Sequence, residues 1–264
     1  ETLVYTDDTA MAIGLAESLV EVGGLDQQHL GETFRDNFNR EPWRGYASGP
    51  PTVFSRVERQ DLTYPEAART LYGGEGSYGN GAAMRIAPLG LFFRDAENLY
   101  EVARLSATVT HAHPVGVDGA AVQARAVAVA ASLNPHLPLS PRDFLSDLLD
   151  TARTQEMRRG LTRVRELLEG DAPSQKAAEE LGQGVAVHRS LPFAIYSFVR
   201  HADSFEGCLF CATLNGGDRD TLGAMACAIS GAYLGVEAIP RSWRSKLENR
   251  EYIEERALQL DKAR

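Results

Sequence analysis

Apolar residues recur at helical spacing along nearly the whole of this 264-residue chain. The first predicted helix starts with Asp8 or Thr9 as its cap. Met11, Leu15 and Leu19 then fall on one face of that helix. Nowhere does the sequence sustain the apolar–polar alternation that is typical of β-strands. Helices must therefore supply the core, and the chain is predicted to be all-α.

Glycine, proline and polar clusters divide the chain into predicted helices. They cover residues 8–22, 26–39, 65–71, 96–111, 118–133, one or two helices within 141–168, then 175–187, 191–201, 204–213, 221–235 and 251–263. Loops are predicted for residues 44–51 and 73–84. In the second stretch, five glycines within nine residues would make a helix costly. No repeat or clear linker interrupts the series, so we expect one compact domain over residues 1–264.

Charge and composition argue against several classes of protein. The net charge is −9 and no basic cluster offsets it, which argues against direct nucleic-acid binding. No apolar run reaches the length of a membrane span. Three cysteines, Cys208, Cys211 and Cys227, do not make a disulfide framework and favour a reducing compartment. We therefore expect an intracellular, cytoplasmic monomer.

Two short acidic stretches stand near opposite ends of the chain, YTDDTAM (5–11) and GGDRDT (216–221). Each places two aspartates and a threonine before a predicted helix rich in small residues. Either pair alone could simply cap its helix. If the stretches meet, four carboxylates would repel one another, and divalent cations that prefer oxygen ligands, such as Mg²⁺, would relieve the repulsion. The candidate ligands are Thr6, Asp7, Asp8, Asp218, Asp220 and Thr221.

The glycine-dense stretch GGEGSYGNGAAM (73–84) is a candidate anion site. Its glycines would leave backbone N–H groups open to a phosphate, and its polar and aromatic side chains could meet a ribose or a base. It is no P-loop, and it lacks the preceding strand of a dinucleotide fingerprint. A purely structural turn is the alternative. The candidate residues are Tyr72, Gly76, Ser77, Tyr78, Gly79, Asn80 and Gly81.

Three further features are predicted to be structural. His111 and His113 in THAHP are isolated, and isolated histidines are more often packed or exposed than catalytic. Asp118 is predicted to cap the helix that starts there. Cys208 and Cys211 form a CxxC without a second pair, so they are expected on one face of an apolar helix rather than on a metal.

Taken in order, YTDDTAM, RGY (44–46), GSYGNGAAMR (76–85), THAHP (110–114) and GGDRDT resemble the motifs of the ADP-ribosylglycohydrolase family. The glycine motif most resembles the serine-directed branch, which also degrades poly-ADP-ribose and O-acetyl-ADP-ribose. Related branches act on ADP-ribosyl-arginine. The resemblance implies an all-α fold with two Mg²⁺ ions at its centre.

The resemblance also implies roles for the candidate residues. The six residues of the acidic stretches match the family's metal ligands, and residues 76–80 match its diphosphate and ribose loop. His111 matches a histidine on the phosphate or ribose side, Tyr72 an aromatic against adenine, and residues 182–184 (GQG) a segment near the adenosine. The implied reaction is Mg²⁺-dependent hydrolysis of the glycosidic bond of an ADP-ribosylated substrate.

The chain departs from the family pattern in two places. A glycine-rich segment with a catalytic glutamate precedes TDDT in the family, whereas this chain starts just before that motif. Neither Glu1 nor Glu75 is taken as its replacement, so the catalytic residue is unknown and the N-terminal segment is expected to be missing. Arg219 stands where the family often has a smaller polar residue, and it is expected to point outward. Arginine-directed hydrolysis and a non-catalytic ADP-ribose-binding or structural protein stay open as alternatives.

Overall fold

The computed structural model describes residues 2–264, so Glu1, considered above as a replacement for the family's glutamate, lies outside the described residues. Helices dominate this part of the chain. Within residues 2–264 the only β-type pairings are two isolated bridges, Leu3 with Leu247 and Gly79 with Ala186. The prediction of an all-α fold is therefore confirmed.

The helices follow one another through short loops. In chain order they are α1 (Asp7–Val22), α2 (Gln27–Arg40), α3 (Gly49–Gln60), α4 (Tyr64–Arg69), α5 (Ala87–Phe92), α6 (Leu99–Thr108), α7 (Pro114–Ser132), α8 (Pro141–Thr151), α9 (Gln155–Glu169), α10 (Ser174–Leu181), α11 (Leu191–Arg200), α12 (Phe205–Thr213), α13 (Arg219–Leu234), α14 (Arg241–Arg244) and α15 (Arg250–Ala263). Four 3₁₀ turns complete the described elements: η1 (Tyr72–Gly74), η2 (Asn80–Ala82), η3 (Val187–Arg189) and η4 (Val236–Ala238).

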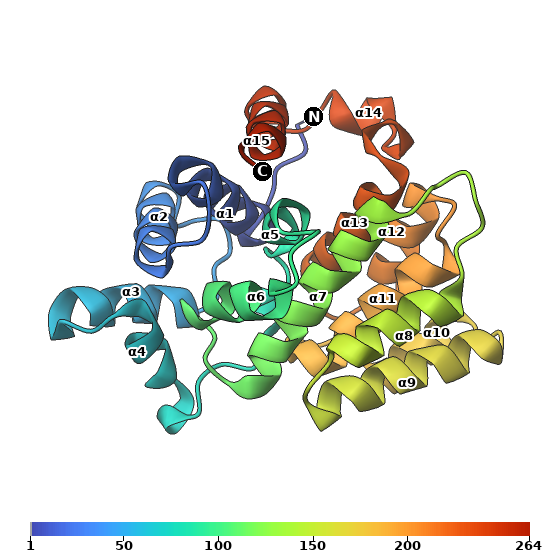
Figure 1. Cartoon of the computed structure of the whole chain (residues 1–264), viewed down its shortest axis with the longest axis horizontal. Coiled ribbons are helices and arrows are strands. Elements are labelled where there is room, and N and C mark those ends of the chain that lie inside the picture. The colour runs from blue at the N-terminus through green and yellow to red at the C-terminus, as the bar shows by residue number, and fades with distance from the viewer. Residues whose placement is uncertain (1) are drawn as a thin grey trace.

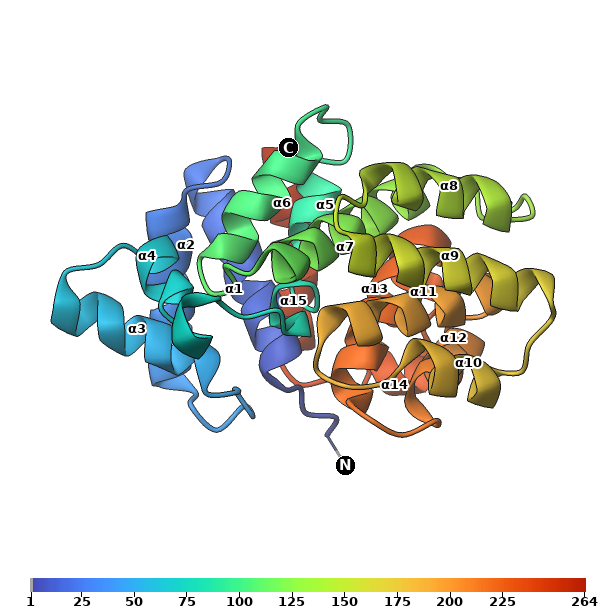
Figure 2. The ribbon, with the colours of Figure 1, turned by 90° about the horizontal axis from the view of Figure 1, so that it is seen from below.

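Helix α7 runs through the middle of the molecule. Helices α1 to α4 lie on one side of it and α8 to α12 on the other, as both ribbon views show (Figure 1, Figure 2). It contacts α5, α6, α8, α9, α11 and α13. Its sequence, PVGVDGAAVQARAVAVAAS, is rich in small residues, so neighbouring backbones can approach from all sides. A helix that is mostly apolar all round is expected to be buried in this way.

Glycines in α7 make room for the loops that carry the candidate site. A Cβ atom at Gly116 would lie 2.5 Å from the carbonyl oxygen of Ser77. One at Gly119 would lie 2.3 Å from the side chain of Val187. Real Cβ contacts are never this short, so glycine at both positions is what lets the glycine-dense loop and η3 rest directly on α7.

Helix α1 buries the face that its sequence predicted. Leu15 and Leu19 are completely buried and Met11 is nearly so. Burying a side chain of this size is worth about 1.5–3 kcal/mol, so this face fixes α1 firmly on the core. The predicted ends were close for most other helices, and residues 141–168 divide into α8 and α9.

The helix prediction was wrong in several regions. Helices α3, α5 and the short α14 were not predicted, and α3 takes up the last residues of the expected loop 44–51. Helices α3 and α5 both carry proline in the first turn, where the missing N–H costs nothing, so these prolines mark helix starts rather than loops. The helix expected over 175–187 stops at Leu181, because Gly182 has a φ of +100°.

Asp118 does not cap a helix of its own, contrary to the sequence prediction. Helix α7 begins earlier, at Pro114, and Asp118 is completely buried within it. Its carboxylate accepts hydrogen bonds from the backbone N–H groups of Arg153 and Thr154, at distances of 2.7–3.1 Å, and from the Tyr100 hydroxyl. Asp118 therefore ties the start of α9 to α7.

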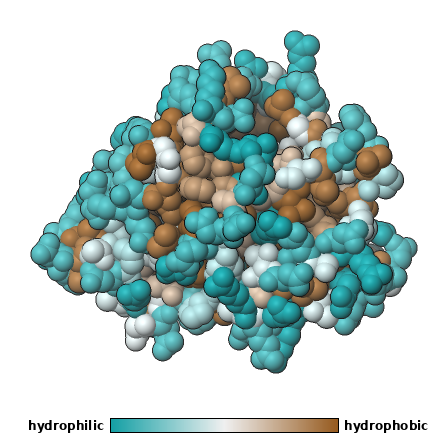
Figure 3. Space-filling model, viewed as in Figure 1, coloured by the Kyte–Doolittle hydropathy of each residue, from teal (hydrophilic) through white to brown (hydrophobic). Residues whose placement is uncertain are grey.

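The outer surface is mostly polar. On the face drawn in Figure 3, hydrophilic side chains cover the periphery and apolar ones gather in patches toward the centre. Among residues 2–264, no helix is long and apolar enough to cross a membrane. All three cysteines are free, and Cys208 and Cys211 lie buried in α12, as the sequence predicted.

Candidate active site

The two acidic stretches start helices α1 and α13, and their carboxylates do not serve as ordinary caps. Thr6 is the N-cap of α1, and its hydroxyl donates a 2.7 Å hydrogen bond to Oδ2 of Asp8. Asp7 and Asp8 follow within the first helical turn. Asp218 is the N-cap of α13, yet its side chain makes no capping hydrogen bond. Capping hydrogen bonds from Thr6 and Asp218 are thus absent, whereas Asp7, Asp8 and Asp220 do stand in first turns, where the helix dipole favours a negative charge.

Helices α1 and α13 are in contact, and the influence of Asp218 and Asp220 on the pKa of Asp7 places the starts of the two helices near each other. Burial raises the pKa of Asp7 to about 7, and the neighbouring charge of Asp8 adds to this. More distant contributions to the pKa of Asp7 come from Asp220 and Asp218. Burial also raises the pKa values of Asp8 and Asp218, with Asp220 contributing to both. Carboxylates from opposite ends of the chain thus lie close enough to interact electrostatically.

The donor chemistry of this cluster fits a hard divalent cation. Oδ1 of Asp8 is buried and has no hydrogen-bond partner among residues 2–264. Such an orphaned carboxylate oxygen is costly unless a cation meets it. No three acidic, imidazole or thiol groups of residues 2–264 already stand at the spacing of a metal-ligand set. The carboxylates of residues 2–264 thus do not stand as a preformed set of three ligands.

Arg44 of the RGY motif holds the start of α1 in place. Its backbone carbonyl accepts a 2.8 Å hydrogen bond from the N–H of Asp7. Its buried guanidinium lies 4.0 Å from the ring centre of Tyr5 and forms ion pairs with Glu41 and Glu248. The motif thus ties α1 to α2 and to the segment before α15.

The glycine-dense loop is joined directly to the acidic cluster. Nδ2 of Asn80 donates a 2.7 Å hydrogen bond to Oδ2 of Asp218, and Asn80 is buried. Sequence reasoning gave Asn80 only a place beside a bound diphosphate. In the structure its side chain also orients a candidate metal ligand.

The segment around GQG (182–184) hydrogen-bonds to the start of α13 and to the glycine-dense loop. The N–H of Asp218 donates to the carbonyl of Gln183 at 2.8 Å, and the N–H of Asn80 donates to the carbonyl of Val185 at 2.8 Å. Gly217 has a φ of +74°, and a Cβ atom there would lie 2.2 Å from the Gln183 carbonyl oxygen. Glycine is therefore required where the two segments cross.

His111 lies against the glycine-dense loop and is nearly completely buried. A Cβ atom at Gly81 would lie 3.0 Å from its Nε2 atom, and one at Gly79 would lie 3.6 Å away. Its Nδ1 atom is 2.8 Å from the hydroxyl oxygen of Thr110. Burial, and secondarily the charge of Arg85, lower the pKa of His111 to about 3. The imidazole is therefore neutral at ordinary pH.

Only some N–H groups of the glycine-dense loop are left for an anion. Those of Gly76, Gly79 and Asn80 already donate to other groups of the protein. Gly76 has a φ of +75°, and a Cβ atom there would lie 2.7 Å from the backbone nitrogen of His113. The Ser77 hydroxyl accepts a 3.1 Å hydrogen bond from the N–H of Gly79. Ser77 is buried, so its hydroxyl faces the loop rather than bulk solvent.

The aromatic candidates are exposed and do not form one group. Tyr72 is 64% exposed and has a φ of +51°, and Tyr78 is 50% exposed. The Tyr78 ring lies 5.4 Å from the ring of His113 and 6.1 Å from that of His188. None of the aromatic pairs described within residues 2–264 joins Tyr72 to Tyr78. Arg219, expected to point outward, is exposed.

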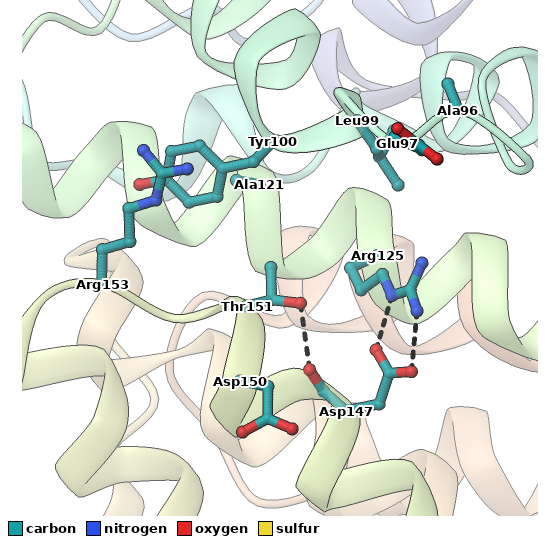
Figure 4. A pocket seen from close by; sticks show the side chains of 10 residues that line it. All are labelled: Ala96, Glu97, Leu99, Tyr100, Ala121, Arg125, Asp147, Asp150, Thr151 and Arg153. Atoms are coloured by element: carbon teal, nitrogen blue, oxygen red, sulfur yellow. Dashed lines mark hydrogen bonds and ion pairs between the residues drawn. The ribbon is translucent and has the colours of Figure 1, made fainter.

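A separate hollow of about 420 Å³ lies among α6, α7 and α8 (Figure 4). Arg125 makes two hydrogen bonds to Asp147 there, and the Arg153 guanidinium lies 3.5 Å from the ring centre of Tyr100. Arg125 and Asp147 are thus already paired with each other, and we assign no ligand to this hollow.

A sequence model of the ADP-ribosylglycohydrolase family matches residues 3–264. This chain belongs to that family. The expectation of a hydrolase of this class is thereby confirmed at the level of the family. Among curated proteins, ADP-ribosylhydrolase ARH3 of Mus musculus is 36% identical over 284 residues, covering 94% of this chain and 74% of that protein. ADP-ribosylhydrolase ARH3 of Homo sapiens is 34% identical over 95% of this chain and 76% of its own length.

A solved structure agrees with this assignment. The chain is similar to a protein described as an ADP-ribosylglycohydrolase-related protein complex, with a TM-score of 0.77 and 27% sequence identity. The match covers 98% of this chain and 81% of the other. Family membership therefore rests on sequence and on fold together.

Sequence reasoning missed three contributors to the site of this ADP-ribosylglycohydrolase. They are Arg85, Thr110 and the backbone carbonyl of Gln183. Arg85 gave a usable signal, because it stands alone within the otherwise apolar run AAMRIAPLGLF. An isolated charge inside such a run is buried only with a specific partner.

Proposed function

We propose that this protein is a Mg²⁺-dependent hydrolase that cleaves the glycosidic bond of ADP-ribosylated substrates. The first candidate substrates are serine-linked ADP-ribose, poly-ADP-ribose and O-acetyl-ADP-ribose. Family membership and the similarity to proteins named ADP-ribosylhydrolase ARH3 support the reaction class. The choice among substrates follows the resemblance of residues 76–85 to the serine-directed branch.

The observation that carries the proposal is the direct link between the two halves of the site. Asn80 in the glycine-dense loop donates to Asp218 in the acidic cluster. ADP-ribose carries a diphosphate beside the ribose whose bond is to be broken. The N–H groups of Ser77 and Tyr78, which do not donate elsewhere among residues 2–264, would meet the diphosphate, and the adjoining carboxylate cluster would hold cations beside that ribose.

Each group of candidate residues would bind a different part of the substrate or the metal ions. Thr6, Asp7, Asp8, Asp218, Asp220 and Thr221 would hold two Mg²⁺ ions. Once bound, Mg²⁺ would supply positive charge for ribose hydroxyls and for the attacking water. Residues 76–80 would bind the diphosphate, with His111 as a neutral N–H donor beside them. Tyr72 and Tyr78 would meet the adenosine end from the exposed rim.

The test measures release of ADP-ribose from a peptide ADP-ribosylated on serine, in Mg²⁺ and in EDTA. Calorimetry of ADP-ribose binding runs beside it. Release in Mg²⁺ and none in EDTA is the expected result. Release from an arginine-linked peptide alone would favour the arginine-directed alternative. Mg²⁺-dependent binding without release would favour the non-catalytic alternative, and the absence of both would contradict the proposal.

We also propose that the protein works as an intracellular monomer on ADP-ribosylated protein, without contacting nucleic acid. The net charge of −9 and the three free cysteines support this proposal. Sedimentation at micromolar concentration would test the oligomeric state.

A further inference from the structure

A completely buried arginine stands behind the glycine-dense loop. Arg85 follows η2 and is 0% exposed. Its Nη1 donates to the Thr110 hydroxyl at 2.8 Å, and its Nη2 donates to the Ser106 carbonyl at 3.2 Å. The guanidinium also lies 4.5 Å from the ring centre of Phe34. Burial lowers the pKa of Arg85 to about 9, and no carboxylate among residues 2–264 offsets this effect, so Arg85 is a buried cation at neutral pH.

The partner of Arg85 is itself the partner of the site histidine. Oγ1 of Thr110 lies 2.8 Å from Nδ1 of His111, and Thr110 is 1% exposed. The three side chains therefore form a buried chain of hydrogen bonds from Arg85 through Thr110 to His111. At its far end, Nε2 of His111 faces Gly79 and Gly81, and no residue between 2 and 264 hydrogen-bonds it.

The donor and acceptor capacities of these three side chains determine where the protons lie between them. Arg85 can only donate, so the Thr110 oxygen must accept from it. The Thr110 hydroxyl has one proton, and among residues 2–264 its only neighbouring acceptor is Nδ1 of His111. If Nδ1 carried a proton instead, the buried hydroxyl proton would have no acceptor, which is unfavourable.

We propose that Arg85 and Thr110 are positioning residues that hold His111 in the tautomer with its proton on Nε2, aimed at the glycine-dense loop. An imidazole fixed in this way donates a hydrogen bond to an oxygen of the bound diphosphate or its flanking ribose without carrying charge. This inference deepens the proposed function and rests on it for the identity of the ligand. The assignment of the tautomer stands on the protein alone.

The first experiment reads the tautomer of His111 in the ligand-free protein by long-range ¹H–¹⁵N correlation. The matched variants are Thr110→Val, which keeps the shape and removes the hydroxyl, and Thr110→Ser, which keeps the hydroxyl. Wild type and Thr110→Ser are expected to hold the Nε2–H form. Thr110→Val is expected to show a mixture with the Nδ1–H form. An Nδ1–H or charged imidazole in wild type, or an unchanged tautomer in Thr110→Val, overturns the proposal.

The second experiment separates positioning from general structural damage. ADP-ribose affinity is expected to fall about tenfold in Thr110→Val, the effect of one hydrogen bond, and to recover in Thr110→Ser. Mg²⁺ affinity should stay at the wild-type value in both variants, whereas loss of both affinities together in Thr110→Val would indicate a merely structural role and overturn the proposal. If the wild type binds no ADP-ribose at all, the proposed function fails, and the tautomer measurement still decides whether Thr110 sets the tautomer of His111.

Discussion

Asn80 donates a 2.7 Å hydrogen bond from Nδ2 to Oδ2 of Asp218, and so joins the loop assigned to the diphosphate with the cluster assigned to the metals. Ser190 lies 3.4 Å from the same amide nitrogen. The loop proposed to bind the diphosphate and the cluster proposed to bind metal are therefore joined by a hydrogen bond within the protein itself.

This coupling predicts the effect of Asn80→Ala. The substitution removes the donor that orients Asp218, so Mg²⁺ affinity should fall about tenfold even without ADP-ribose, as expected for a hydrogen bond to a charged group. Calorimetric titration of Mg²⁺ measures the change. Wild-type Mg²⁺ affinity in this variant would mean that Asn80 serves the ligand alone.

Ser77→Ala is the matched variant on the same loop. The Ser77 hydroxyl contacts the N–H of Gly79 and no carboxylate of the cluster. We expect ADP-ribose to bind about tenfold more weakly and Mg²⁺ to bind as in wild type. Unchanged ADP-ribose affinity would show that the loop is only a structural turn.

Asp220→Asn should abolish Mg²⁺-dependent binding while the helical circular-dichroism signal stays intact. Asp220 is exposed and its charge raises the pKa values of Asp7, Asp8 and Asp218, so Asp220→Asn removes a candidate ligand without opening the core. The control is Asp261→Asn, an equally exposed aspartate near the C-terminus. Equal Mg²⁺ affinity in the two variants would contradict the metal assignment.

Gly217→Ala should damage the site through the backbone. Its φ is +74°, and the added Cβ would lie 2.2 Å from the Gln183 carbonyl oxygen, which would push Asp218 out of place. Gly23→Ala is the control, because Gly23 has a φ of +68° and nothing within 4 Å of an added Cβ. The control should lose about 1–2 kcal/mol of unfolding free energy, measured in urea. Gly217→Ala should lose more and should also lose Mg²⁺ affinity; similar losses of stability with intact Mg²⁺ affinity would refute this account.

The buried His111 predicts a pH dependence of stability. Its pKa is about 3 in the folded protein, against an ordinary value of 6.5. In the unfolded chain His111 binds a proton below pH 6.5, whereas in the folded protein it does so only below about pH 3. Within that window, each fall of one pH unit should remove up to about 1.4 kcal/mol of unfolding free energy through this group.

The variant His111→Asn isolates this contribution. Its side-chain oxygen can still accept from Thr110, and it does not titrate. Denaturant unfolding of both proteins from pH 7 to pH 4 gives the comparison, which cancels the carboxylates common to both. Parallel stability curves would show that His111 takes up its proton readily in the folded state.

The sequence alone determined the helical class and most helix positions, because a 3.6-residue apolar period needs no knowledge of neighbours. It also determined the candidate ligands, since Asp7, Asp8, Asp218 and Asp220 stand out by residue type and order. The sequence prediction was wrong for helices that begin with proline and for the role of a buried polar side chain. Prolines in α3 and α5 looked like loop signals, and Asp118 looked like a cap.

Only the tertiary structure decided which of these residues meet. Some 210 residues separate Asp8 from Asp218, and no local pattern encodes that distance in space. Packing of α1, α7 and α13 closes it. The same packing buries Arg85 beside Thr110 and so sets the proton on His111. Sequence patterns name the groups that can do chemistry, whereas burial and long-range hydrogen bonds decide their charge, direction and partners.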